Sequence, residues 1–248
     1  IGFIFAALSL GVMIDFYGER SLIYALLVTQ LVIFFLAFIL PEKKINFTKF
    51  NKRSIWPILK KREVIVLLLS CALMVSSHGL LYNFYSIFLE DQGYSGATIG
   101  LLWSVGVVFE ILIFLLMPKI LSKFTLKSVL LISIAFAVLR FFLIGAYVDS
   151  ILILIAAQIM HAATFGSFHV ASIQLIAHFF YNEHQARGQS LYNSITYGVG
   201  GAIGGLGGGY MNEYSGMANT FMLSAVLPFV GFFVLLLGLK TKFKAEFK

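Results

Sequence analysis

Long apolar runs separated by short polar connections follow one another along the whole chain. At a rise of about 1.5 Å per residue, a helix of about 20 residues crosses the hydrocarbon core of a bilayer. The runs exceed the length of barrel strands and lack strict alternation of apolar and polar positions. The pattern therefore predicts eight helical spans, the first of them short: Ile1–Ile14, Leu22–Leu40, Val64–Phe88, Thr98–Met117, Leu126–Val148, Ile151–Phe180, Leu191–Tyr210 and Ala218–Leu239.

Composition indicates an all-α, polytopic membrane helix bundle. Hydrophobic residues make up 60% and charged residues 12% of the chain, whereas about 25% of residues are charged in soluble domains. The formal charge of +7 would fit a nucleic-acid partner if the cations formed one patch. They lie between the apolar runs instead, so the expected partner is the lipid bilayer and not nucleic acid.

The basic residues collect in alternate connections. Sixteen of the 18 lysines and arginines follow the second, fourth, sixth and eighth runs, and the remaining connections hold only Arg20. Lysine and arginine accumulate on the cytoplasmic side of membrane proteins. The sequence therefore predicts a multi-pass protein of the cytoplasmic (inner) membrane with a cytoplasmic C-terminus.

One long connection divides the chain. Residues 41–63 are polar and basic and contain Pro57, and we expect a cytoplasmic linker between two bundles formed by residues 1–40 and 64–248. The chain opens at Ile1 inside an apolar run without a starting methionine, so we expect it to be part of a longer protein. Cys71 is the only cysteine, which excludes a disulfide framework and a zinc site built on cysteines. No metal or organic cofactor is expected.

Glu110 and His161 are the ionisable residues inside the runs that we expect to couple a proton. Glu110 lies at mid-helix depth, where a charge costs about 2.5–3.5 kcal/mol on insertion scales. His161 and His169 lie in the uncharged run Ile151–Phe180. At about 100° per residue, these histidines share one broad helical face with Thr164, Phe165, Phe168 and Ser172, the geometry of a helix that lines a binding cavity. The alternative is a fixed polar contact that only locks two helices together.

Arg140 is the only cation within a span, and its guanidinium stays charged. It requires an anion, which we expect to be either Glu110 or a substrate carboxylate bound by the guanidinium fork. Snorkelling toward the headgroups is the alternative. It fits less well, because Arg140 lies several residues inside both ends of its run.

Polar-tipped aromatic residues mark the third and fourth runs. His78, Tyr82 and Tyr85 recur at i, i+4 and i+7, so they share a helical face, and Trp103 shares a face with Glu110. We expect these side chains, with Phe165, His169 and Asn193, to bind substrate. Aromatic packing between helices would produce the same pattern.

Glycines crowd the seventh run in the segment GVGGAIGGLGGG, residues 198–209. Pairs such as Gly200 and Gly204, four residues apart, let membrane helices approach closely. The segment is not a dinucleotide-binding loop, because Ile203 occupies the last glycine position of that template. Enzyme motifs are absent from the sequence as well, with neither H-E-x-x-H nor a glycine-flanked serine elbow. An enzyme is therefore not expected.

Three segments resemble one transporter family: HGLLYNFYSIFLEDQGYSGATIGLLWSVGVVFEILIF, LLISIAFAVLRFFLIGA and QIMHAATFGSFHVASIQLI. They are similar to the 3-phenylpropionate permease-like transporters of the major facilitator superfamily (MFS), relatives of the oligosaccharide/proton symporters. The resemblance implies that the eight runs correspond to the fifth to twelfth helices of a twelve-helix fold. It places the family's membrane glutamate on Glu110, its arginine on Arg140, and its histidine pair on His161 and His169.

The segment GVMIDFYGER, residues 11–20, looks like a degenerate copy of the superfamily's G-x-x-x-D-R-x-G-R loop, with Phe16 in place of the basic residue. The charge pattern places this segment outside the cell. The symporters' carboxylate on the histidine-bearing helix has no counterpart here, which leaves Glu110 as the candidate proton site.

These observations lead to one functional hypothesis and two rivals. We expect a proton symporter that moves a small organic solute, such as an aromatic carboxylic acid, by alternating access between two bundles. The proton would be its coupling ion, and the complete protein would be a monomer. One rival is a sugar or nucleoside proton symporter of the same fold. The other is a membrane scaffold or partner-binding subunit that transports nothing.

Overall fold

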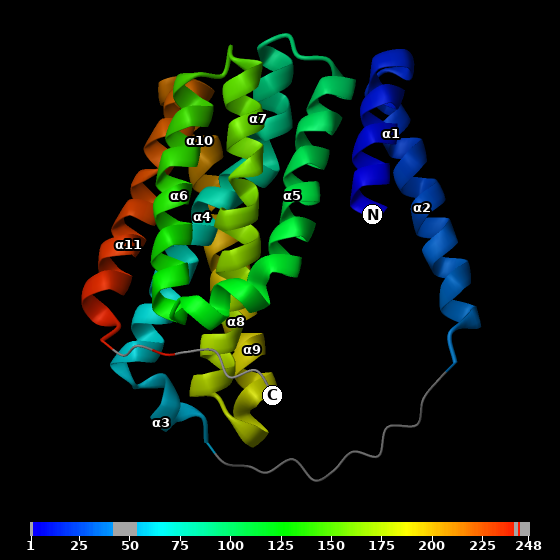
Figure 1. Ribbon diagram of the computed structural model, residues 1–248. Helices are drawn as coiled ribbons and strands as arrows, with labels where there is room; N and C mark the ends of the chain where they lie inside the picture. Colours follow the sequence, from blue (N-terminus) through cyan, green and yellow to red (C-terminus); the bar gives the residue numbers. More distant parts are fainter. Residues whose placement is uncertain (1, 42–53, 241–242, 244–248) are drawn as a thin grey trace.

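The computed structural model describes residues 2–41, 54–240 and 243 (Figure 1). Most of the predicted linker, residues 42–53, lies outside these described residues. The described parts consist of helices: α1 (Gly2–Tyr17), α2 (Arg20–Ile39), α3 (Trp56–Leu59), α4 (Arg62–Asp91), α5 (Gly96–Lys123), α6 (Leu126–Ala146), α7 (Ile151–Ile159), η1 (Ala162–Ser167), α8 (Phe168–Phe179), η2 (Asn182–His184), α9 (Gln185–Asn193), η3 (Ser194–Gly200), α10 (Gly201–Ser224) and α11 (Val226–Gly238).

The helices reproduce the predicted runs with three differences. Six described stretches are long and apolar enough to cross a membrane, and α1 is a shorter apolar helix. The sixth run is one stretch, Ile151–Phe179, but it contains the π-helical turn η1. The seventh and eighth runs form a single stretch, Asn182–Gly238, in which Gly216 reverses the chain with a φ of 75°. The short helix α3 was not predicted from the sequence.

The helices begin where the sequence supplies capping side chains. The Ser95 hydroxyl accepts a hydrogen bond from the backbone N–H of Thr98 at 3.2 Å at the start of α5. Thr125 caps α6 through the N–H of Ser128 at the same distance. Such caps satisfy amides that have no partner inside the helix, so α5 and α6 start immediately after short connections.

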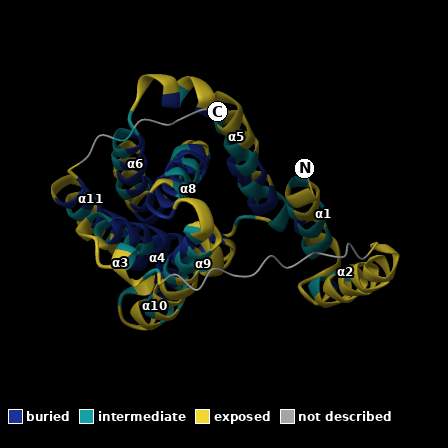
Figure 2. Ribbon diagram, turned by 90° about the horizontal axis from the view of Figure 1, so that it is seen from below, coloured by how far each residue is buried: buried dark blue, intermediate teal, exposed yellow. Residues whose placement is uncertain are grey.

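Helix α4 occupies the centre of the bundle formed by α4–α11 (Figure 2). It packs against η3, α10 and α11, and α6 packs against α8, α10 and α11. The outlying helix α2, by contrast, contacts only α1 to any extent and is exposed along most of its length (Figure 2).

The glycine-rich segment lies directly against α4. A Cβ atom built on Gly204 would lie 1.8 Å from the backbone oxygen of Ser76, and one on Gly200 would lie 2.7 Å from that of Ala72. Only glycine permits such contact, which confirms the close helix approach predicted from its four-residue spacing. The pairing 72 with 200 and 76 with 204 means that α4 and this segment run in the same direction.

The chain returns along α4 in the opposite direction after Gly216. The Ser77 hydroxyl donates to the backbone oxygen of Ser224 at 2.7 Å, and a Cβ on Gly238 would meet Val66 at 2.5 Å. Residue numbers thus fall along α4 as they rise along α11. The single helical stretch therefore contains two antiparallel segments, as the two predicted runs require.

Candidate functional site

Glu110 and His161 lie together in the middle of the α4–α11 bundle. The His161 Nε2 atom is 3.8 Å from a carboxylate oxygen of Glu110, and their side chains are 6% and 17% exposed. Gly166 allows this approach between α5 and η1, because a Cβ there would lie 2.5 Å from Ile113 Cγ2, one turn from Glu110 on α5. The two residues predicted to couple the proton are therefore neighbours on different helices.

Arg140 is completely buried on α6. Its guanidinium donates to the Ala157 backbone oxygen at 2.8 Å, to Thr164 Oγ1 at 3.3 Å and to Gln158 Oε1 at 3.3 Å. All three acceptors are neutral and belong to α7 and η1. Among residues 2–41, 54–240 and 243, no carboxylate lies within ion-pair distance of Arg140, since Glu110 pairs with His161 instead.

The π-helical turn Ala162–Ser167 arranges one side of this centre. The His161 and Phe165 rings stack at 5.3 Å with an interplanar angle of 8°, and Phe165 stacks on His169 at 5.9 Å and 9°. The wider turn also directs Thr164 away from this ladder and toward Arg140. Such π-turns occur frequently at functional sites, and here one turn supplies both the ring ladder and a ligand for the cation.

The residues that were predicted to share one helical face in the run Ile151–Phe180 do not all lie on one side in the structure. Phe168 is 1% exposed within the hydrophobic core, and Ser172 is fully buried with its Oγ 3.5 Å from Cys71 Sγ. The sequence argument assumed a regular turn of about 100° per residue. The π-turn breaks that regularity, so these two residues do not share a cavity face with the ring ladder.

Aromatic side chains from α4 and α5 complete the cluster. Tyr82 stacks on Trp103 at 6.0 Å and 19°, and Tyr85 meets the edge of Trp103 at 5.4 Å. Tyr82 also lies edge-on to His161 at 6.5 Å and to Phe165 at 6.4 Å. The predicted aromatic residues of three helices therefore form one continuous surface.

His78 and His169 stand at opposite sides of the cluster. The His78 ring lies 5.2 Å from Phe141 and 6.2 Å from His161, and its Nδ1 atom is 3.1 Å from the Met74 oxygen. At the other side, His169 Nδ1 lies 3.0 Å from the hydroxyl of Tyr197. Asn193 is exposed at the end of α9, and no described hydrogen bond or ring contact joins it to the cluster.

Several buried polar atoms of the cluster have no hydrogen-bond partner among the described residues: His78 Nε2, Tyr85 OH, Gln158 Nε2 and His161 Nδ1. Buried polar groups are normally paired, and exceptions call for an explanation such as a ligand or water. Tyr85 OH and Gln158 Nε2 can donate, whereas the two histidine nitrogens are acceptors in a neutral ring, because the other ring nitrogen faces the Met74 oxygen or the Glu110 carboxylate. The described residues contain no group of three or more histidine, cysteine or carboxylate side chains that could hold a metal ion.

Gln158 and Thr164 are the ligands of Arg140 that sequence reasoning did not assign. Both were visible as polar residues in an apolar run, and Gln158 lies one turn before His161. A helical wheel could not show that they turn toward α6. Gly106, which shares a face with Trp103, lies against both Gln158 Oε1 and His161, at 3.0 and 3.5 Å from a built Cβ.

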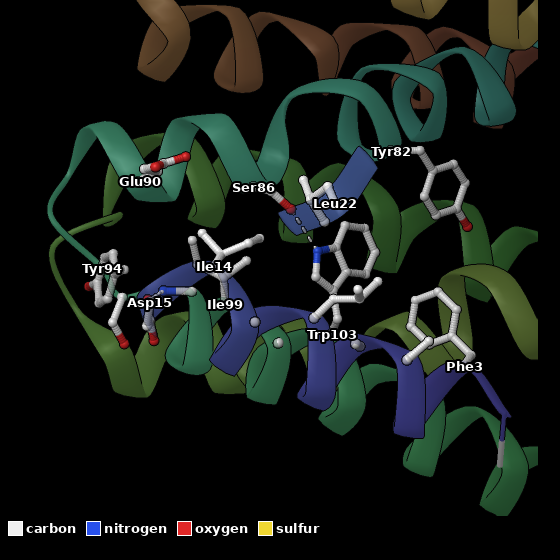
Figure 3. Close-up of a pocket in the computed structure, with 17 residues that line it drawn as sticks. Phe3, Ile14, Asp15, Leu22, Tyr82, Ser86, Glu90, Tyr94, Ile99 and Trp103 are labelled. Atoms are coloured by element: carbon white, nitrogen blue, oxygen red, sulfur yellow. Dashed lines mark hydrogen bonds between the residues drawn. The ribbon is translucent and has the colours of Figure 1, made fainter. Parts of the chain in front are cut away.

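A cavity of about 550 Å³ adjoins the cluster between α1, α4 and α5 (Figure 3). Phe3, Tyr82 and Trp103 gather at one end of it, where Trp103 donates to the Ser86 hydroxyl at 3.0 Å. Asp15 lies at the other end (Figure 3). Tyr82 and Trp103 thus border both the cavity and the ring surface around His161.

Comparison with known proteins decides the family. The sequence profile described as "MFS_1 like family" matches residues 1–240. The chain belongs to this family. As an MFS_1 like protein it is placed among membrane transporters and not among enzymes, and the expected resemblance and all-α polytopic fold are confirmed.

Two relatives indicate how far the similarity extends. The "Probable 3-phenylpropionic acid transporter" of Escherichia coli (strain K12) is 32% identical over 173 residues, which cover 70% of this chain and 45% of that protein. The "Uncharacterized transporter YwbF" of Bacillus subtilis (strain 168) is 25% identical over 150 residues, covering 60% of this chain and 37% of that protein. The MFS_1 like chain thus aligns with less than half the length of either relative.

Proposed function

We propose that this chain forms the proton- and substrate-binding part of a secondary active transporter. The complete protein, as a monomer in the cytoplasmic membrane, would import or export a small organic acid together with protons. The observation that carries the proposal is the Glu110–His161 pair at 3.8 Å beside the fully buried Arg140, which has only neutral ligands.

Glu110 and His161 would carry the coupled proton. A charged side chain at membrane depth is costly, so a carboxylate there is most easily kept with a proton or beside a cation. A proton shared by this pair neutralises one site and leaves the other polar. A change in the surroundings of the pair between two conformations would then load and release the proton.

Arg140 would bind the carboxylate of the substrate. Nε and one N–H of each terminal nitrogen are used by Ala157, Thr164 and Gln158, which leaves two N–H donors for an anion. The Gln158 side chain is the natural group to move, because its contact with Arg140 is long at 3.3 Å and its own Nε2 has no partner. A bound carboxylate would supply the missing negative charge.

The apolar part of the substrate would lie on the aromatic surface. Tyr82, Trp103 and Phe165 provide ring faces and edges, and His169 with Tyr197 provides polar atoms beside them. An aryl group fits such a lining through offset and edge-on contacts. One relative carries the name of a 3-phenylpropionic acid transporter, and an aromatic carboxylic acid is the substrate class we propose here.

The proposed orientation follows from the charge pattern of the connections. Lys61, Lys123 and Lys127 lie at one end of the bundle, and Asp91 and Asp149 belong to connections at the other. With basic residues inside, the end of the bundle at which α4 begins and α11 ends faces the cytoplasm, which would make the C-terminus cytoplasmic. The cavity of Figure 3 then lies toward the outer end.

Uptake by the full-length protein in liposomes tests this function. We expect accumulation of 3-phenylpropionic acid to follow an imposed pH gradient, and Glu110→Gln to abolish that dependence because amides cannot take up the proton. Glu213→Gln, at an exposed carboxylate, is the matched control and should transport normally.

Three outcomes would contradict parts of the proposal. Unchanged pH dependence in Glu110→Gln would remove the proton role. Transport of a sugar or nucleoside in place of the acid would favour the neutral-substrate rival. A folded protein that neither binds nor moves 3-phenylpropionic acid, a sugar or a nucleoside would favour the scaffold.

A further inference from the structure

A continuous apolar groove follows α4 between the glycine-rich segment and α11. One part of it, with a volume of about 550 Å³, lies between α3, α4, η3 and α11, and a second part of about 370 Å³ lies between α4, α10 and α11. Both parts are lined by Ser76, Ile203 and Leu227, so they join. The whole, which we call the α4 groove, extends from Ile65 to Leu80, about 22 Å at 1.5 Å per residue.

The glycine-rich segment leaves the α4 groove open. Gly204 and Gly208 lie directly against α4, and Gly207 has no atom within 4 Å of a built Cβ. Few side chains therefore occupy the space between α10 and α11. The walls are apolar and only partly covered, since Ile203 is 54% and Leu223 47% exposed. In a membrane protein such a surface meets lipid tails, because no water is present at this depth.

One end of the α4 groove opens beside a cluster of cations. Trp56 and Leu59 of α3 line the groove there. Lys60, Lys61 and Arg62 follow directly along the chain, and all three are exposed. Figure 2, which is seen from this end, shows α3 between α10 and α11 beside α4. Within the described part of the chain, none of these cations forms an ion pair.

The surroundings of this opening favour a negatively charged group. The three cations are accompanied by one carboxylate in the same stretch, Glu63. No side chain caps the start of α4, so the free backbone amides of its first turn add positive potential. Tryptophan, here Trp56, is enriched where lipid headgroups meet the hydrocarbon. Cations at headgroup level thus adjoin the entrance of an apolar groove.

We propose that the α4 groove binds an acyl chain of an anionic phospholipid whose headgroup lies at Lys60, Lys61 and Arg62. Basic clusters next to membrane helices bind such headgroups. A chain from the leaflet on this side reaches the middle of the hydrocarbon core at a depth of about 15 Å. Ser76, where the two parts of the groove join, lies about 16 Å along α4 from Ile65. This lipid site is additional to the proposed transport function and does not depend on it.

Fluorescence quenching of Trp56 by brominated lipids tests the site. The full-length protein is prepared with Trp56 as its only tryptophan and is placed in phosphatidylcholine bilayers that contain increasing fractions of phosphatidylglycerol brominated on its acyl chains. We expect phosphatidylglycerol to bind at least about tenfold more tightly than brominated phosphatidylcholine. Lys60→Gln/Arg62→Gln should lower that preference at least about fivefold, because each cation near the headgroups contributes a factor of about five.

Matched variants separate a specific site from general surface attraction. Lys119→Gln/Lys123→Gln removes the same charge from the end of α5, outside the groove, and should keep the preference. Gly207→Phe adds a ring that leans toward Ile203, since helical side chains point toward the N-terminus, and should reduce quenching by phosphatidylglycerol at least about threefold. Ala135→Phe adds the same ring at an exposed position of α6 and should match the parent. All variants are first shown to be monodisperse in detergent.

Three outcomes would overturn the inference. Equal affinities for the two lipids in the parent, or equal effects of the two double charge variants, would leave only general attraction to the surface. Unchanged quenching in Gly207→Phe would place the lipid outside the groove. Cross-linking between Ile203→Cys copies, without quenching of Trp56 by either lipid, would make a second copy of the chain the occupant. The measurement uses neither substrate nor a proton gradient, so failure of the transport assay leaves the lipid site intact.

Discussion

Arg140→Gln should selectively weaken binding of acidic substrates. The substitution removes the one buried cation among the residues that the structure describes, while keeping a side chain that can hydrogen-bond. Arg140 is 0% exposed and bound to three neutral acceptors. The unliganded protein therefore loses no ion pair, and replacing an uncompensated buried charge is not expected to be strongly destabilising.

The magnitude follows from the hydrogen bonds of the guanidinium. Two N–H donors remain for a carboxylate, and a hydrogen bond to a charged group contributes about 1.5–3 kcal/mol. Displacing Gln158 costs about 1 kcal/mol. A net loss of about 2–5 kcal/mol in the binding free energy of the acid corresponds to a Kd that is raised between about 30-fold and about 4,000-fold in Arg140→Gln.

Binding of 3-phenylpropionic acid and of its primary amide to the purified full-length protein measures this difference. The amide lacks the charge, so its Kd should change by less than about tenfold in Arg140→Gln. For the acid, the Kd of Arg140→Lys should lie between the Kd of the parent protein and that of Arg140→Gln, because an ammonium keeps the charge but loses the planar fork. Equal weakening of acid and amide, or no weakening of either, would refute the carboxylate role.

Two further predictions concern packing and the polar end of the cluster. Gly204→Ala drives a Cβ to 1.8 Å from the Ser76 oxygen, so it should lower the free energy of unfolding in detergent by about 1–3 kcal/mol. The control Gly207→Ala should leave that free energy within about 0.5 kcal/mol of the parent's. Equal effects of the two substitutions would contradict the packing argument. His169→Phe keeps the ring stack but loses the contact with Tyr197, so it should reduce transport about as much as Tyr197→Phe. The double variant should show no further loss of transport. Additive losses would show that the two residues act separately.

Local pattern was sufficient for much of the architecture. Runs such as Leu126–Val148 are long and apolar, with Lys127 at the start and Arg140 as the one charge further inside, so a membrane helix is the structure that satisfies their backbone. The glycine spacing predicted close helix contact because a helix face without side chains lets any neighbouring helix approach closely. Glu110 and His161 stood out for a similar reason, since ionisable groups are rare inside membrane helices.

The partners of the ionisable groups could not be predicted from the local sequence pattern. Glu110 was one of the two anions expected for Arg140, but α7 and η1 surround the guanidinium with neutral oxygens while Glu110 meets His161. The π-turn also escaped prediction, because a helical wheel assumes a constant angle per residue. The Asp15 carboxylate accepts a hydrogen bond from the backbone N–H of Gly96, which is 81 residues away, and no periodicity within one segment can encode a contact across that separation.

The sequence by itself determined where the long apolar helices lie along the chain and which few side chains are out of place in hydrocarbon. Those properties depend on hydropathy and charge, which act residue by residue against the bilayer. The tertiary structure alone decided which buried groups face one another, where α1 and α5 approach each other, and which polar atoms are left unpaired. Such choices depend on how closely and at what angle whole helices pack, and that geometry is set by contacts between residues far apart in the chain.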